Sequence, residues 1–310
     1  MNIAYLISAF TDPQHLKRLI NALNTEHAFF FIHIDKKIDI RQFKNICKGS
    51  NIFFLPDRVR VYWGTYSQVE FQMRLIKAAL SDGHRFGKMF MLSGQDYPLW
   101  SNEKIMQWAE DTKGRDMISG ICIDSDDVEE KYKQLYRLNR PQTDIKWTSP
   151  KMNDITSKAL RKTLLMVGSK KPLNLTVDDQ LWHLYKGSDY FALTHDTAEY
   201  AYKQWRRHKE IKDYFKTSFA PSETCIHTII FNNPKYSKKG DLHTGNYTTL
   251  QALTPLHHIE YDPVIKVWKD GDFDELMDSG KMFARKFESD TSDSLMDIID
   301  KMREDVTTSN

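Results

Sequence analysis

The chain has 310 residues, of which 40% are hydrophobic and 28% charged, so it is long enough for one large domain or two modest ones. Its 44 Lys and Arg residues nearly balance its 42 Asp and Glu residues, which argues against a bulk nucleic-acid binder because such proteins carry a strong basic excess. The three cysteines, Cys47, Cys122 and Cys225, have no short spacing, which argues against a disulfide framework or a zinc site and favours free thiols in a reducing compartment.

Apolar runs and helical patterns alternate over the first third of the chain. Short apolar runs predict buried strands at 3–9, 29–35, 52–55, 88–94 and 117–121, with another short strand at 59–63. Apolar residues at helical spacing predict helices over 12–23, 67–80 and 103–110. This alternation indicates an α/β fold with a mostly parallel sheet. Ligands of such sheets bind beyond the carboxyl ends of the strands, where Asp35 and the loop after Ser93 are expected.

The pattern weakens between 124 and 174, which is charged and interrupted by prolines, and then resumes. Later elements are expected as a strand at 189–193, a helix at 197–209, a helix that starts near Asp272 and ends at Gly280, and a helix at 293–303. No apolar stretch is long enough to span a bilayer, and residues 1–10 are typical of a strand rather than a leader. We therefore expect a cytoplasmic protein.

One carboxylate, Glu223, stands in a turn directly before an apolar helical stripe. Pro221 fixes φ and Ser222 is able to cap the helix, so Glu223 is expected in its first turn. A carboxylate fixed in this way has the geometry that a general base needs. The same pattern also fits a carboxylate that only complements the helix dipole.

Seven further segments form a collinear set over almost the whole chain, at 4–7, 31–35, 63–69, 91–98, 186–193, 221–223 and 283–287. No single segment is specific, but together they resemble the core-2/I-branching β-1,6-N-acetylglucosaminyltransferase and peptide O-xylosyltransferase family. The resemblance implies a bacterial-type member with a GT-A-type, Rossmann-like glycosyltransferase fold, a mostly parallel central sheet and helices on both faces. It implies one domain over 1–310, with a nucleotide-binding half at 1–123 and an acceptor-binding and catalytic half at 124–310.

The resemblance also implies a reaction. A UDP-sugar, carrying GlcNAc or xylose, donates its sugar to a glycan hydroxyl with inversion at the anomeric carbon. Glu223 matches the base that deprotonates the acceptor, although the family usually has Pro-Asp-Glu where this chain has Pro-Ser-Glu at 221–223.

Most GT-A enzymes hold a divalent metal with an Asp-x-Asp motif, whereas this family works without one. The sequence agrees, because Asp96 stands alone after the strand that ends at Ser93. Two other segments fit the bare motif, 124–126 and 270–272, and we interpret them as a solvated loop and a helix cap. No cofactor is expected.

Cations take the place of the metal in this family, and the resemblance assigns that role to Lys286 and Arg285, with His257 as a second basic position. Solvated basic residues near a helix end are the ordinary alternative for the first two, and a structural polar group for His257.

The resemblance and the strand-end rule together nominate binding residues. Nucleotide-sugar contacts are expected from Ser8, Ala9, Phe10, Asp35, Trp63, Ser67, Gln95, Asp96 and His257. Acceptor contacts are expected from Gly187, Ser188, Asp189 and Tyr190, and from Trp147 in the variable middle of the chain. Turn capping is the ordinary role for the two aspartates at strand ends, and packing for the tryptophan.

The sequence excludes one alternative function and leaves two others open. A dinucleotide oxidoreductase is excluded because residues 8–13 contain no glycine and so lack the phosphate-binding fingerprint. A degenerate UDP-sugar-binding protein and a metal-dependent GT-A transferase stay as alternatives. From family context we expect a surface polysaccharide or glycolipid as acceptor, and peripheral contact with the inner membrane is a hypothesis.

Overall fold

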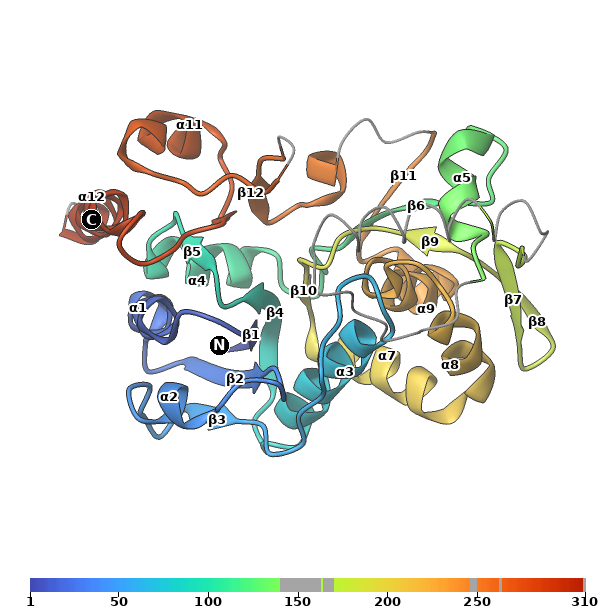
Figure 1. Cartoon of the computed structure of the whole chain (residues 1–310), viewed down its shortest axis with the longest axis horizontal. Coiled ribbons are helices and arrows are strands. Elements are labelled where there is room, and N and C mark those ends of the chain that lie inside the picture. Colours follow the sequence, from blue (N-terminus) through green and yellow to red (C-terminus); the bar gives the residue numbers. More distant parts are fainter. Residues whose placement is uncertain (140–162, 164–169, 246–249, 262–263, 309–310) are drawn as a thin grey trace.

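The structure, a computed structural model, describes residues 1–139, 163, 170–245, 250–261 and 264–308. Its centre is a five-stranded sheet with the order β10-β4-β1-β2-β3, in which β10 alone runs antiparallel (Figure 1). The strands are β1 (Asn2–Ala9), β2 (Ala28–Ile34), β3 (Ile52–Phe54), β4 (Phe86–Ser93) and β10 (Ala192–Leu193). The predicted mostly parallel sheet is therefore confirmed.

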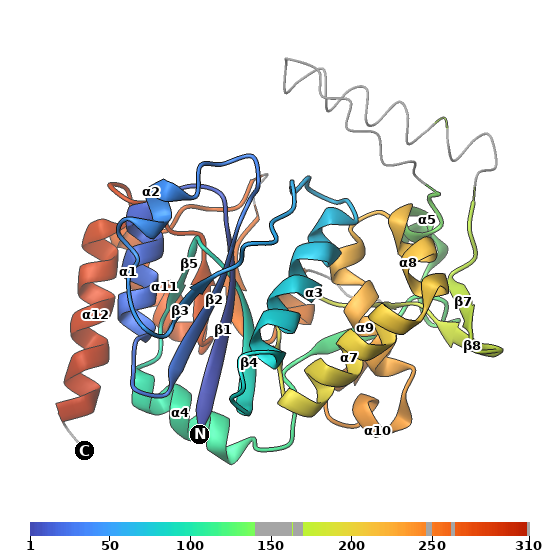
Figure 2. The same cartoon turned by 90° about the horizontal axis from the view of Figure 1, so that it is seen from below.

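Helices cover both faces of this sheet, as the α/β pattern requires (Figure 2). Alternate residues of β1 divide between two cores: Tyr5 and Ile7 face α1, α2 and α4, while Ala4 and Leu6 face α3. The flanking helices are α1 (Pro13–Leu23), α2 (Arg41–Lys44), α3 (Ser67–Leu80), α4 (Asn102–Asp111) and α7 (His195–Arg207). β1 and β2 are continuous apolar runs because they are buried on both faces.

Two smaller three-stranded sheets extend the central one. The first has the order β12-β13-β5 and brings β12 (His257–Ile259) and β13 (Phe283–Arg285) against β5 (Asp96–Pro98). The second has the order β11-β6-β9, with β6 (Ser119–Cys122), β9 (Tyr185–Lys186) and β11 (Asp241–His243). In both small sheets, strands from the second half of the chain thus pair with a strand from the first half.

The remaining elements surround the second sheet and the C-terminus. They are α5 (Glu130–Tyr136), the hairpin β7 (Asn174–Val177) and β8 (Gln180–His183), α8 (Lys209–Lys216), η1 (Pro221–Glu223), α9 (Cys225–Phe231), α10 (Pro234–Ser237), η2 (Leu250–Leu253), η3 (Asp270–Asp272), α11 (Phe273–Asp278) and α12 (Asp293–Thr308). Within the described ranges, each helix is too short or too polar to cross a bilayer.

Several local predictions need correction. Residues 59–63, all described, form no strand, and the strand expected at 189–193 shrinks to Ala192–Leu193, since the chain bends at Asp189. Ser222 caps no helix: Glu223 ends a 3-10 turn, and α9 begins two residues later. The cap expected at 270–272 is confirmed, since the backbone amide of Lys269 donates to Asp272 Oδ2 at 2.9 Å.

A close approach at Gly187 gives a test of the packing between β9 and α9. A Cβ added there would lie 2.1 Å from His227 Nε2 and 2.3 Å from the Ser119 carbonyl oxygen. Gly187→Ala should therefore destabilise the fold by about 1–3 kcal/mol or more, measured by urea denaturation. Gly271→Ala is the matched control, because a Cβ there meets nothing within 4 Å. Equal stability of the two variants would contradict this packing.

Candidate active site

The carboxylate of Glu223 is held by a tight turn. The chain enters the turn through Ala220, whose φ of 43° lies in the left-handed region, and Pro221 starts the 3-10 helix. The carbonyl of Glu223 accepts a 2.8 Å hydrogen bond from the amide of Gly187, which follows β9. Backbone contacts from two segments therefore fix the residue, while its side chain stays 24% exposed.

Lys186 orients that carboxylate. Its ammonium group is buried, with 3% of the side chain exposed, and it forms an ion pair with Glu223 Oε2. The same ammonium donates to the Gly187 carbonyl at 2.5 Å. The sequence comparison included Lys186 but gave it no role, because its partner lies 37 residues away along the chain. A buried cation beside a half-open carboxylate is the arrangement expected where the carboxylate must keep one orientation.

A second carboxyl group, Asp189, lies beside the first. Burial, and then the negative charge of Glu223, raise the pKa of Asp189 to about 6. The amide of Gln72 lies 3.3 Å from Asp189 Oδ1 and supports it. The next residue, Tyr190, links Asp189 to one of the predicted cations, since the guanidinium of Arg285 stands 5.9 Å from the centre of its ring.

Arg285 places a cation at the carboxyl end of β4. Its Nη1 donates to Ser93 Oγ and lies 3.3 Å from Asp96 Oδ1, and 12% of its side chain is exposed. The pairing of β13 with β5 puts Arg285 directly opposite Asp96, so the strand register itself creates the ion pair. The cation is thereby fixed before any ligand arrives.

Asp96 and His257 were expected to contact the donor, and the structure places both inside the protein. Both side chains are fully buried and have no surface to offer a nucleotide. Asp96 Oδ2 accepts from the Ser93 amide at 2.7 Å and lies 3.0 Å from His257 Nε2. The two residues therefore hold Arg285 and the end of β4 in place.

Lys286 is the more accessible of the two predicted cations, with 26% of its side chain exposed. Its ammonium lies 2.7 Å from Glu288 Oε1, which also accepts from the side-chain amide of Gln95 at 3.3 Å. The sequence did not indicate Glu288. This carboxylate joins two residues that were expected to face the donor.

The other nucleotide candidates lie at strand ends and in the loop before α3. Ser8 and Ala9 close β1, and their carbonyls accept from the amides of Gly94 and Asp35. Asp35 is nearly buried and pairs with Lys37 at 3.2 Å, and Ser67 Oγ accepts from the Tyr62 amide. The side chains of Asp35 and Ser67 are thus engaged in internal contacts, and the binding roles of all four residues stay predictions.

Two aromatic candidates are open to solvent. Phe10 is 52% exposed after β1, and Trp63 is 72% exposed and packs edge-on against Phe219 at 5.8 Å. The amide of Ala220 donates to the Gly64 carbonyl at 3.1 Å. The Trp63 loop and the Glu223 turn therefore lie side by side.

The acceptor candidates from 187 to 190 adjoin the Glu223 turn, and Ser188 Oγ lies 3.1 Å from Thr254 Oγ1. Trp147 falls outside the described residues. Tyr261 is 54% exposed, and the partial burial of its hydroxyl, followed by the charge of Glu223, raises its pKa. The positive charge of Arg285 acts on the pKa of Tyr261 in the opposite direction.

Comparison with known proteins identifies the family of the chain. Residues 3–265 match the model of the Core-2/I-Branching enzyme family. The chain belongs to this family. It is 24% identical to xylosyltransferase 2 of Rattus norvegicus over 97% of the chain, and 23% identical to N-acetyllactosaminide beta-1,6-N-acetylglucosaminyl-transferase of Mus musculus over 93%.

The extent of these matches differs. The chain covers 33% of the length of the rat relative and 69% of the length of the mouse relative. Among solved structures, core-mannan synthase A of Aspergillus fumigatus is similar with a TM-score of 0.36 and 10% identity, over 78% of this chain and 72% of that one.

The Lys186–Glu223 ion pair can be measured by a double-mutant cycle. Lys186→Met and Glu223→Gln, alone and combined, should give a coupling energy of about 1–3 kcal/mol in urea denaturation, because one partner is buried. The surface pair Lys203–Glu199 is the matched control and should couple by about 0.3–0.5 kcal/mol. A Lys186–Glu223 coupling no larger than the control value would contradict the buried pair.

Proposed function

We propose that the protein is an inverting glycosyltransferase that moves GlcNAc or xylose from a UDP-sugar to a glycan hydroxyl without a catalytic metal. The observation that carries this proposal is the half-open carboxylate of Glu223, oriented by buried Lys186, in a site that reaches the fixed cation of Arg285 through Tyr190. The named activities of the relatives, a xylosyltransferase and an N-acetylglucosaminyl-transferase, support the same reaction class.

The proposed reaction is a single displacement. Glu223 accepts the proton of the acceptor hydroxyl as the oxygen attacks the anomeric carbon of the donor. The bond from that carbon to the diphosphate oxygen breaks on the opposite face, and UDP leaves with the bonding electrons. Lys186 keeps the carboxylate turned toward the acceptor throughout.

Negative charge on the departing diphosphate meets two cations in this proposal. Arg285 is preorganised by Ser93 and Asp96, so little reorganisation is needed when charge develops. Lys286 bonds to Glu288 in the free protein, and a phosphate oxygen would replace that carboxylate as its partner. The two cations together would take the place of the divalent metal of other GT-A enzymes.

The biological setting is proposed from family context alone. The acceptor is a growing surface polysaccharide or a glycolipid, and the protein acts in the cytoplasm with peripheral contact to the inner membrane. Flotation with anionic vesicles at physiological salt tests the proposed membrane contact. A protein that stays in the soluble fraction would contradict that contact.

Glu223→Gln tests the base. The variant should bind UDP with unchanged affinity in calorimetry, yet its sugar transfer to a panel of simple glycosides should fall about 100-fold or more, because no general base remains. Glu210→Gln, which changes an exposed carboxylate on α8, is the control and should match the wild type. Undiminished transfer by Glu223→Gln would refute this role. Binding without any turnover by the wild type would favour the degenerate binding protein.

Lys286→Ala and Arg285→Ala test the cations. Each should weaken UDP binding about tenfold or more and lower turnover, since each removes charge-assisted contacts to the diphosphate. The measurement is calorimetry with UDP-GlcNAc and UDP-xylose, in EDTA and then in added Mn²⁺. Binding that requires Mn²⁺, with both variants unaffected, would favour a metal-dependent transferase instead.

A further inference from the structure

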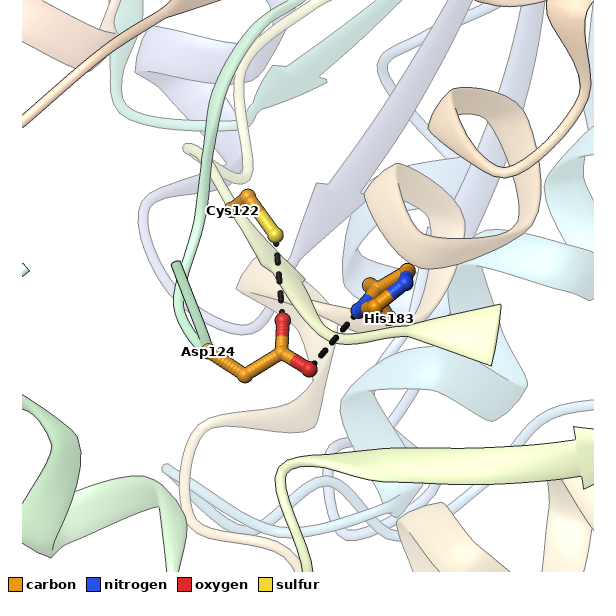
Figure 3. Close-up of side chains that lie close together, drawn as sticks. All are labelled: Cys122, Asp124 and His183. Atoms are coloured by element: carbon orange, nitrogen blue, oxygen red, sulfur yellow. Dashed lines mark hydrogen bonds and ion pairs between the residues drawn. The ribbon is translucent and has the colours of Figure 1, made fainter. Parts of the chain in front are cut away.

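A second cluster of chemically reactive side chains lies outside the candidate active site. Cys122 ends β6, Asp124 follows it by two residues, and His183 ends β8 (Figure 3). The thiol of Cys122 donates to Asp124 Oδ1 at 3.0 Å, and His183 Nδ1 lies 2.8 Å from Asp124 Oδ2. One sulfur, one nitrogen and one oxygen thus fall within 4.8 Å of one another.

The backbone around this cluster is firmly held. Asn232, which caps α9, accepts from the His183 amide at 2.9 Å and donates to the His183 carbonyl at 2.7 Å. Cys122 pairs with Tyr185 across β6 and β9, and the amide of the next residue, Ile123, donates to Leu184 at 2.8 Å. Cys122 and His183 therefore project from fixed backbone positions, which a metal site requires.

Sequence reasoning missed the cluster for two reasons. Cys122 has no second cysteine or histidine at the short spacing of a zinc motif, since His183 is 59 residues from Asp124. The segment 124–126 was also expected to be solvated, whereas only 15% of the Asp124 side chain is exposed. Its carboxylate is turned inward between the thiol and the imidazole (Figure 3).

The arrangement does not fit a nucleophilic cysteine. In such triads the imidazole lies between the thiol and the acid, whereas here the carboxylate lies between them. Burial, and then the hydrogen bond to Asp124, raise the pKa of Cys122 to about 12, which opposes thiolate formation in the metal-free protein.

We propose that Cys122, Asp124 and His183 form a binding site for one Zn²⁺-class ion. Thiolate, imidazole and carboxylate are the ligands that Zn²⁺ takes in proteins, at about 2.0–2.3 Å, which sets neighbouring ligand atoms about 3.3–3.8 Å apart. The present contacts of 2.8 and 3.0 Å need to open by less than about 1 Å. His183, with 49% of its side chain exposed, leaves a path from solvent and room for a water as fourth ligand.

The proposed binding of Zn²⁺ is balanced in charge and in protons. The thiol proton that Cys122 now shares with Asp124 passes to solvent, a sulfur–metal bond forms, and the thiolate and carboxylate together neutralise the two positive charges. No electron transfer is involved.

This site is separate from the proposed chemistry. Tyr185 and Lys186 are neighbours on β9 and point to opposite faces, so Cys122 and the Glu223 ion pair lie on opposite sides of the β6–β9 pair. The ion would tie the β7–β8 hairpin to β6 and stabilise this region. It would not touch the donor or the acceptor.

The test uses the full chain, stripped of metal and titrated with Zn²⁺ and with Co²⁺. We expect one equivalent to bind, thermal stability to rise, and Co²⁺ to give a thiolate charge-transfer absorption. Cys122→Ser should abolish that absorption, and Asp124→Asn and His183→Gln should each weaken binding at least tenfold. His84→Gln is the matched control, because it removes a surface imidazole that also lies 2.6 Å from a carboxylate, that of Asp82.

Two results would overturn the proposal. One is the absence of stoichiometric binding to the wild type. The other is binding that all three variants retain, with circular dichroism showing each of them folded. Sugar transfer is measured in parallel with and without the ion, so a failure of the proposed function would leave the metal titration interpretable by itself.

Discussion

The carboxylate of Asp96 is the contact on which the geometry of the candidate site depends. It is fully buried, and the Ser93 amide, Arg285 and His257 all direct polar atoms at it. A buried charge of this kind persists only when it is paired and hydrogen-bonded. Because its partners come from β4, β13 and β12, this one group holds the end of the central sheet against strands from the far end of the chain. Removing it would leave Arg285 as a buried cation without its carboxylate.

The same long-range pairing explains what the sequence could and could not predict. Helical spacing and apolar runs located β1, β2, β4 and the main helices, since those signals are local. The turn at Glu223 was also locally visible in Pro221. The partner of Glu223, and the burial of Asp96, were not, because they depend on contacts across 37 and 161 residues. His257 illustrates the limit: its type suggested a cation, and its fully buried position gives it a packing and orienting role.

The candidate site is assembled from both halves of the chain. One hydrophobic core runs from Ala4 in β1 to Leu253 in η2, and β10 adds an antiparallel edge to the first sheet. The short turn that carries Glu223 is bonded to the Trp63 loop through Ala220 and to β9 through Gly187. The Glu223 turn and the Trp63 loop are therefore positioned by one packed unit, so a shift of either would disturb the other.

Replacing a metal by cations in the proposed reaction carries a physical condition. Arg285 and Lys286 together supply the formal charge of a divalent ion, but a metal concentrates that charge on one atom whereas side chains spread it. The spread is effective only if the cations do not relax away from the diphosphate. Arg285 meets this condition through its anchoring by Ser93 and Asp96. Lys286 does not meet the condition, because its partner Glu288 is 37% exposed and is not held in one position by burial. The expected division is that Arg285 stabilises the developing charge and Lys286 follows the phosphate as it leaves.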